Sequence, residues 1–198
     1  VNLDGFKHVD LNAYGHEIKN TVEQHTGIPV GVGIAPTKVL AKLANRLSKK
    51  VAHFNYVCVI DSDEKRKEAL TWAETKDIWG LGKKYQERLA NIGVFTALAF
   101  TEVPLSWVRK EMTVVGERLW RELRGESCIV FDTLPRKKKA IGTAKSFGKR
   151  LTDLATIEEA CAYYISEVSE VLRAQKSCAT HLQVFLTTNY HSLYDKQY

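Results

Sequence analysis

Apolar residues near the beginning of the chain recur at helical spacing. Four of them follow one another at intervals of three or four positions: Leu11, Tyr14, Ile18 and Val22. This pattern predicts an amphipathic helix over residues 10–25, with Asp10 as its N-cap. Gly27 and Pro29 are expected to end the helix, because glycine is favoured just past a helix and proline cannot continue one.

The following residues alternate between strand and helix patterns. The stretch "PVGVGIA" (29–35) predicts a short strand, and a helical rhythm then runs from about Thr37 to Lys50. A second strand is predicted in "FNYVCVID" (54–61), before the polar sequence "DSDEK". The order helix, strand, helix, strand indicates part of a layered α/β or α+β domain.

Residues 66–125 carry helical patterns, and the predicted helices are short. The breaks are expected at glycine and proline, which fall at Gly80–Gly82, Gly93, Pro104, Gly116 and Gly125. Residues 126–139, which end in "PRKKK", are expected to be a connector. We therefore place domain boundaries near residues 65–75 and within 126–139.

The last part of the chain predicts a strand, a long helix and a second strand. These elements correspond to "AIGTAKSFGKRL" (140–151), "TIEEACAYYISEVSEVLRAQ" (156–175) and "HLQVFLTT" (181–188). Such a βαβ piece is expected to be half of a larger domain. The chain has no initiator Met and stops in loop-like sequence, so we expect it to be a piece of a longer protein.

The composition favours a partner of negative charge. The 198 residues carry a net charge of +6 and have a pI near 9.1, which suits nucleic acid or an anionic membrane surface. No apolar stretch approaches the roughly 20 residues that a membrane span needs. The four cysteines fit no CxxC metal pattern, so reduced thiols in a cytoplasmic protein are the expected state.

The helix predicted over residues 37–50 separates apolar from basic residues. Its apolar face consists of Val39, Leu40, Leu43, Ala44 and Leu47. The opposite face consists of Lys38, Lys42, Asn45 and Lys49, flanked by Arg46 and Lys50. No acidic residue is interleaved to form the i,i+4 pairs of a solvated face, and a Gly-x-Gly strand end, where backbone can approach a ligand, precedes the helix. We predict that the basic face binds phosphate, with an ordinary solvated helix as the alternative.

A second candidate site lies in "DIWGLGKKYQERLANIGVFTALAF" (77–100). Gly80, Leu81 and Gly82 form the h-G-h-G pattern of a helix-hairpin-helix motif, and Lys83 and Lys84 follow directly. The glycines let backbone N–H groups point outward beside a helix N-terminus, which is an anion-binding arrangement. The predicted contact is to the DNA backbone and therefore independent of base sequence. The alternative is a plain helical hairpin with glycine at a C-cap.

A third candidate is the basic segment from residue 136 to residue 150. It contains seven basic residues and no acid: Arg136, Lys137, Lys138, Lys139, Lys145, Lys149 and Arg150. The last three lie on the strand predicted around Ser146, and a strand edge that carries lysines can follow a sugar-phosphate backbone. If this segment and residues 38–50 face the same way, they line one groove. The alternative for "RKKK" is a solvated linker.

Four stretches occur in the order found in one enzyme family: "VGVGIAPTKVLAKLANRLSKK", "IWGLGKKYQERLANIGV", "LWRELRGE" and "AKSFGKRLTD". Over nearly its whole length the chain resembles the Y-family translesion DNA polymerases. "RELRGE" and "SFGKRLTD" resemble the UmuC-like branch, which serves SOS mutagenesis, and a DinB-type enzyme is the nearest rival.

The resemblance implies an α+β fold in four parts. Residues 1–65 would be the C-terminal part of a palm domain (αβαβ), and residues 66–125 a small helical thumb with the helix-hairpin-helix. Residues 126–139 would be a linker, and residues 140–198 the N-terminal half of a βαβ-type little-finger domain. The resemblance also implies that Lys49 contacts the triphosphate of the incoming nucleotide, with Lys38 and Lys42 on the same face.

The resemblance further implies two Mg²⁺ ions held by three carboxylates, which we expect upstream of this chain. Asp10 imitates the first metal motif but is the start of a helix. Asp63 and Glu64 imitate the second motif but follow the basic helix, whereas the family order places that motif before it. Asp61 or Ser62 is expected to cap a short helix there. We therefore expect no catalytic or metal-binding residue in this chain, and no activity of the chain by itself.

The expected function is that of a fragment of an error-prone polymerase for DNA damage bypass, which binds primer–template DNA through its backbone. For the parent protein the resemblance implies an incoming nucleotide, a UmuD′-like subunit, RecA and a sliding clamp as partners, and a cytoplasmic, nucleoid-associated location. A non-enzymatic helix-hairpin-helix module of a repair protein is the main alternative. A nuclease scaffold is a further one, although no clustered carboxylates support it. An "S-x-D-E" sequence encoded directly before Val1 would decide for the polymerase.

Overall fold

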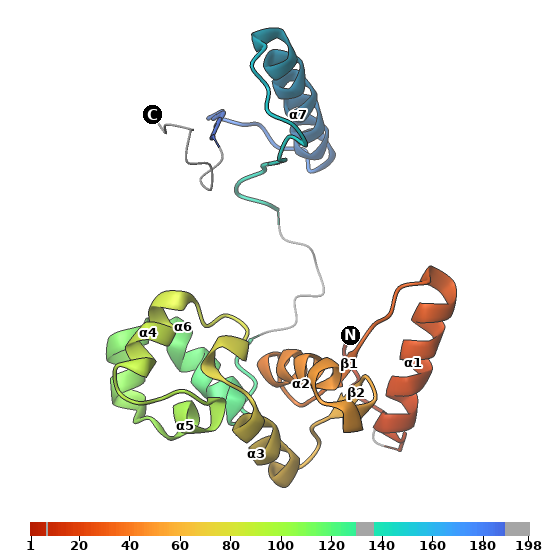
Figure 1. The fold of residues 1–198 in the computed structure, drawn as a ribbon, viewed down its shortest axis with the longest axis vertical. Coiled ribbons are helices and arrows are strands. Elements are labelled where there is room, and N and C mark those ends of the chain that lie inside the picture. Colours follow the sequence, from red (N-terminus) through yellow and green to blue (C-terminus); the bar gives the residue numbers. More distant parts are fainter. Residues whose placement is uncertain (7, 130–136, 189–198) are drawn as a thin grey trace. The chain divides into compact units, whose positions relative to one another are not determined.

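A computed structural model describes residues 1–6, 8–129 and 137–188. The chain divides into two compact units, a first unit of residues 1–131 and a second unit of residues 132–198, and each is described by itself. The α-helices and strands, labelled in Figure 1, are α1 (Leu11–Thr26), β1 (Val32–Ile34), α2 (Lys38–Lys50), β2 (Val57–Val59), α3 (Asp63–Trp72), α4 (Lys83–Ala90), α5 (Ala97–Glu102), α6 (Leu105–Leu123) and α7 (Leu154–Ala174). Two short 3₁₀ helices are η1 (Ala52–Phe54) and η2 (Thr75–Asp77). No helix in these described ranges is both long enough and apolar enough to cross a membrane.

The predicted helix-strand-helix-strand order at the start of the first unit is confirmed. The Asp10 carboxylate caps α1 by accepting hydrogen bonds from two backbone N–H groups, at 2.9 and 3.2 Å, and Gly27 ends the helix with a left-handed φ of 68°. β1 and β2 pair in parallel, with Val32 opposite Val57. Helix α1 packs on one face of this small sheet and α2 packs on the other. Gly15 of α1 lies against Val57 of β2, and Gly33 of β1 lies against the backbone of α2.

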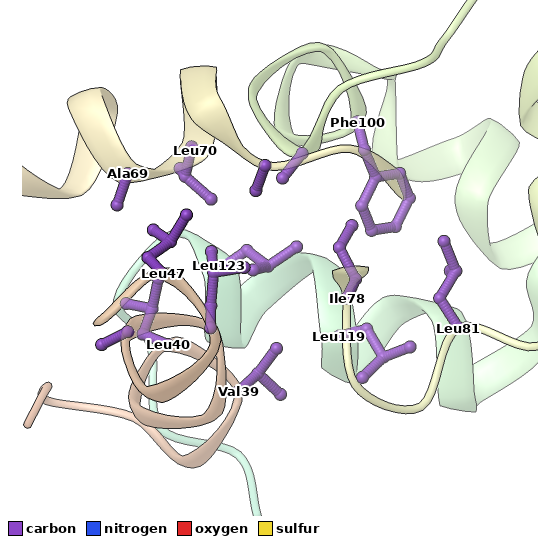
Figure 2. Packing of buried hydrophobic residues seen from close by; sticks show 14 of the residues in the cluster. Val39, Leu40, Leu47, Ala69, Leu70, Ile78, Leu81, Phe100, Leu119 and Leu123 are labelled. Carbon is purple, nitrogen blue, oxygen red and sulfur yellow. The ribbon is translucent and has the colours of Figure 1, made fainter. Parts of the chain in front are cut away.

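One hydrophobic core extends from α2 through the helices that follow. Helix α2 contacts the sheet and also packs against α3 and α6. Figure 2 shows the side chains that meet there, from α2, α3, α5, α6 and the turn between η2 and α4: Val39, Leu40, Leu47, Ala69, Leu70, Ile78, Leu81, Phe100, Leu119 and Leu123. The apolar face predicted for residues 37–50 is therefore confirmed as a buried face. The division of these residues into a palm piece and a thumb stays a prediction.

Helix α6 corrects one expected break. The sequence predicted an interruption at Gly116, but Gly116 is buried inside the helix, where an added Cβ would lie 2.2 Å from the Cβ of Met112. The interruption falls at Thr113, whose φ of 60° and ψ of −168° are not helical. The hydroxyl of Thr113 accepts a hydrogen bond from the N–H of Val115 at 3.4 Å and so begins the second half of the helix. Glycine at 116 serves close packing rather than a turn.

The second unit contains α7, which confirms the helix predicted over residues 156–175. The strands predicted over 140–151 and 181–188 are wrong: no residue between 137 and 188 forms a strand. A strand is stable when its backbone groups pair with a neighbouring strand and its apolar face is covered. Here Leu182, Val184 and Leu186, which form the apolar alternation that suggested a strand, are 67%, 54% and 63% exposed and so remain uncovered.

Candidate nucleic-acid interface

Two of the basic residues of α2 are engaged by a buried acid. Nε of Arg46 lies 2.6 Å and Nζ of Lys50 lies 3.0 Å from Oδ1 of Asp77, whose side chain is 4% exposed. The other carboxylate oxygen of Asp77 accepts a hydrogen bond from the N–H of Glu74 at 3.3 Å. Burial by itself raises the pKa of Asp77, but the hydrogen bonds from Lys50 and Glu74 and the nearby Arg46 outweigh it and hold this pKa below its usual value. Asp77 is therefore ionised at neutral pH and neutralises part of the basic face.

Sequence reasoning missed Asp77 because it searched for acids within one helix turn of the basic residues. Asp77 is 27 positions away from Lys50 in sequence and reaches it through the fold. The signal that could have found it is a single acid directly before the glycine hairpin, in "KDIWGLG".

The remaining lysines of this face differ in their surroundings. Lys42 and Lys49 are exposed and form no ion pair with any residue in the described ranges. Lys38, in the first turn, is half-buried. The basic face that α2 offers to a ligand thus centres on Lys42 and Lys49, with Lys38 at its edge. The assignment of Lys49 to a nucleotide triphosphate stays a prediction.

The Gly-x-Gly strand end serves packing, which corrects the expectation that it admits a ligand. A Cβ on Gly33 would lie 2.1 Å from the backbone nitrogen of Asn45 and 2.3 Å from the carbonyl oxygen of Ala41. The side-chain amide of Asn45 also donates a hydrogen bond to the carbonyl oxygen of Gly31. Because glycine lacks a side chain, α2 itself occupies the space beside the strand.

The N-terminus of α2 is occupied by a second buried carboxylate, Glu122 of α6. Oε2 of Glu122 accepts a hydrogen bond from the N–H of Val39 at 3.2 Å, and the Thr37 hydroxyl donates to the Glu122 carbonyl oxygen at 2.8 Å. Oε1 accepts from the N–H groups of Cys128 and Ile129 at 2.6 and 2.9 Å. The carboxyl oxygens of Glu122 therefore occupy the place where a bound anion would meet this helix end. Sequence reasoning missed this residue as well, because its burial at 0% exposure is a property of the fold.

The glycine turn before α4 is open at Gly82, and its assignment to a helix-hairpin-helix motif stays a prediction. Gly80 has a left-handed φ of 88°, which favours glycine, and Leu81 is buried at 4% exposure. Gly82 precedes α4 with nothing within 4 Å of the position of a Cβ. The element before the hairpin is the three-residue η2, and α3 ends earlier, at Trp72.

The backbone N–H groups at the start of α4 are available for a ligand. The N–H groups of Tyr85 and Gln86 donate to the carbonyl oxygen of Gly82, at 2.9 and 3.1 Å. Those of Gly82, Lys83 and Lys84 donate to no acceptor in the part of the chain that the structure describes. All three residues are exposed. Three outward amides and two ammonium groups therefore share one helix end, an arrangement that suits phosphate oxygens.

The basic segment of the second unit does not form the expected strand edge. Ser146, Lys149 and Arg150 are exposed in irregular structure. Nζ of Lys145 contacts both carboxylate oxygens of Glu167 on α7, at 3.1 and 3.0 Å. That hydrogen bond raises the pKa of Lys145. Arg136 lies outside the described residues.

The described residues offer no cluster for a metal ion. Among residues 1–6, 8–129 and 137–188, no group of three or more His, Cys, Asp or Glu side chains is placed to hold one. Asp10 caps α1, and Asp63 forms an ion pair with Arg66 at 3.0 Å. Ser62 caps α3 by accepting from the N–H of Lys65, which confirms the predicted cap.

Comparison with known families gives two matches within the chain. Residues 1–46 match the impB/mucB/samB family, and residues 138–198 match the impB/mucB/samB family C-terminal domain. Together the two matches cover more than half of the chain.

Individual relatives align with almost the whole chain. Protein ImpB of Salmonella typhimurium is 32% identical over 192 residues, which is 96% of this chain and 45% of ImpB. Protein UmuC of Salmonella typhimurium strain LT2 is 35% identical over 190 residues, with the same shares. DNA polymerase IV of Pseudomonas entomophila is 27% identical over 177 residues, 88% of this chain and 48% of that protein. The chain therefore spans about half the length of the relatives it matches.

Among solved structures, an insertion ternary complex of Dbh DNA polymerase aligns with 81% of this chain and 45% of that chain. The sequence identity is 20% and the TM-score is 0.49.

Proposed function

The chain belongs to the impB/mucB/samB family, and we propose that it forms the primer–template-holding part of a UmuC-like translesion DNA polymerase. The predicted resemblance to the Y-family polymerases of SOS mutagenesis is thereby confirmed. DNA binding by this chain is the proposal. Its contacts are to the phosphate backbone, so they tolerate any base sequence and any lesion between the contacted phosphates.

The observation that carries the proposal is the open end of α4. The buried side chains of Ile78, before the glycine turn, and Leu81, within it, fix the hairpin to the core. The N–H groups of Gly82, Lys83 and Lys84 donate to no acceptor in the described part of the chain. Backbone amides held in this way bind a phosphate without losing conformational entropy, and the lysine side chains add charge.

The other predicted sites have separate roles in the proposal. Lys49, with Lys42 and Lys38, would contact the triphosphate of an incoming nucleotide. In the second unit, Lys145, Ser146, Lys149 and Arg150 would contact the DNA backbone. Lys145 would reach DNA only by exchanging Glu167 for a phosphate.

Nucleotide transfer itself is not assigned to these residues. The two Mg²⁺ ions that the family implies need clustered carboxylates, and the described residues do not supply such a cluster. A UmuD′-like subunit, RecA, a sliding clamp and a location with the cytoplasmic nucleoid are proposals for the whole polymerase.

The direct test is binding of the chain to a fluorescent primer–template, measured by anisotropy at several salt concentrations. We expect log Kd to rise linearly with log salt, with a slope of about 0.9 for each phosphate contact. Gly82→Val should weaken binding about tenfold or more, because the added side chain blocks the approach of a phosphate to amides that form charge-assisted hydrogen bonds.

The matched control is Gly142→Val. Gly142 also has open space around the Cβ position and no left-handed φ, so the same substitution is made without touching the hairpin. A Kd that does not change with salt concentration would contradict the proposal as a whole. An affinity of the Gly82→Val chain equal to that of the unsubstituted chain would contradict the assignment of the hairpin.

A further inference from the structure

Asp77 joins the two candidate phosphate-binding elements of the first unit. It ends η2, three positions before Gly80, and its carboxylate contacts Arg46 and Lys50 in the last turns of α2. The same α2 helix carries Lys42 and Lys49 on the adjacent part of its surface. One side chain thus links the hairpin to the basic face of α2.

The burial of this link sets it apart from an ordinary surface ion pair. Exposed pairs are weak because water competes for both charges. The Asp77 side chain is 4% exposed, while Arg46 and Lys50 keep 48% and 47% of their side chains exposed. The carboxylate also accepts the Glu74 N–H, so η2 is held to the same group. A shift of Asp77 would therefore move the entrance of the hairpin relative to α2.

We infer that Asp77 is a positioning residue for DNA binding, which fixes the hairpin amides relative to α2 so that they meet the DNA backbone in one orientation. This inference rests on the proposed function and adds to it the residue that sets the geometry of the site. Asp77 itself repels DNA, so its contribution to affinity acts through Arg46 and Lys50.

The direction in which one substitution changes DNA affinity distinguishes a positioning role of Asp77 from a purely electrostatic one. Asp77→Asn removes a negative charge close to the proposed DNA site and releases two cations, so electrostatics by itself predicts tighter binding. Loss of the fixed position of the hairpin relative to α2 predicts weaker binding. We expect Asp77→Asn to weaken primer–template binding about tenfold and to reduce the salt slope by about 0.9, because at least one phosphate contact is lost.

The matched control is Glu87→Gln on α4. Glu87 is exposed, lies in the same helix as Lys83 and Lys84 and forms no ion pair within the described residues. Glu87→Gln therefore removes the same charge as Asp77→Asn without breaking a contact between the hairpin and α2. We expect Glu87→Gln to bind as tightly as the unsubstituted chain or up to about twofold more tightly. Binding by Asp77→Asn that equals or exceeds that of Glu87→Gln would overturn the inference.

A second set of variants tests whether Asp77 acts through its two partners, and it stays informative if Asp77→Asn does not fold. Arg46→Gln with Lys50→Gln should weaken binding more than Lys67→Gln with Lys110→Gln, which removes the same charge from exposed lysines outside any ion pair of the described residues. Adding Asp77→Asn to the first pair should cause no further loss. Equal effects of the two pairs would overturn the inference. No binding by the unsubstituted chain would instead overturn the proposed function.

Discussion

At the residue scale, two buried carboxylates from the later helices hold the two ends of α2. Glu122 accepts the Val39 N–H at the N-terminus, where the helix dipole favours an anion. Asp77 pairs with Arg46 and Lys50 toward the C-terminus, where cations are favourable. Each acid thus meets α2 at groups that carry positive charge. Both lie far from α2 in sequence, so the contacts that hold the helix in its place in the fold come from residues outside its own pattern.

Glu122 should be among the residues whose truncation costs most stability. Glu122→Ala leaves the buried N–H group of Val39 and the half-buried N–H groups of Cys128 and Ile129 without their acceptor, and we expect a loss of about 3 kcal/mol in the free energy of unfolding. Urea unfolding followed by circular dichroism measures it. Glu102→Ala, at an exposed glutamate outside any ion pair of the described residues, is the control and should change stability by less than about 0.5 kcal/mol. Equal losses would show that the Glu122 contacts do not stabilise the fold.

At the element scale, the sequence predicted what is encoded locally. Caps and apolar spacing identified α1, α2 and α7, because a helix satisfies its backbone within its own residues. The strands over 140–151 and 181–188 failed, because a strand depends on neighbours that its own sequence does not specify. The glycine turn before α4 is likewise encoded locally, whereas the pairing of Asp77 with α2 joins residues far apart in sequence. The break in α6 was assigned to Gly116, although the strained residue is Thr113.

The break in α6 is spanned by an ion cluster. Arg109 lies before Thr113 and Glu117 after it, yet Nε and Nη2 of Arg109 lie 2.7 and 2.8 Å from the Glu117 carboxylate. Eight residues of straight helix would separate the two backbones by about 12 Å, so the break brings these side chains together. Arg121 adds a third contact to Glu117 at 3.0 Å. These hydrogen bonds, first from Arg109 and then from Arg121, lower the pKa of Glu117 from 4.5 to about 2.

The stability provided by this cluster should therefore depend on pH. Because the folded-state pKa of Glu117 lies below its unfolded value, the contribution is complete above 4.5 and is lost as the pH falls toward about 2. Glu117→Gln should lower the free energy of unfolding at neutral pH, and its difference from the unsubstituted chain should shrink steadily on acidification. Urea unfolding of both chains over this range measures the difference. A difference in the free energy of unfolding that does not change with pH, as expected for Glu102→Gln at an exposed position, would contradict the role of the cluster.

At the scale of the whole molecule, candidate DNA contacts occur in both units. The first unit has a continuous core and presents the hairpin and α2. In the second unit, α7 has no buried residue, and Lys145 is held by Glu167 and lies 5.0 Å from the ring centre of Tyr163. If both units contact the same DNA, the second contact forms at the high effective concentration that the connecting chain imposes. Affinity then depends on both units, although neither contact needs to be strong.

This coupling predicts how substitutions in the two units combine. Lys145→Gln with Lys149→Gln should weaken primer–template binding by the full chain, and should do so by the same factor whether residue 82 is glycine or valine, because contacts to one DNA add in free energy. The stoichiometry should stay at one DNA per chain. Lys67→Gln with Lys110→Gln supplies the control for the loss of two positive charges. If the second-unit substitutions act no more strongly than this control, the DNA is held by the first unit, and the basic residues from 137 to 150 serve another purpose.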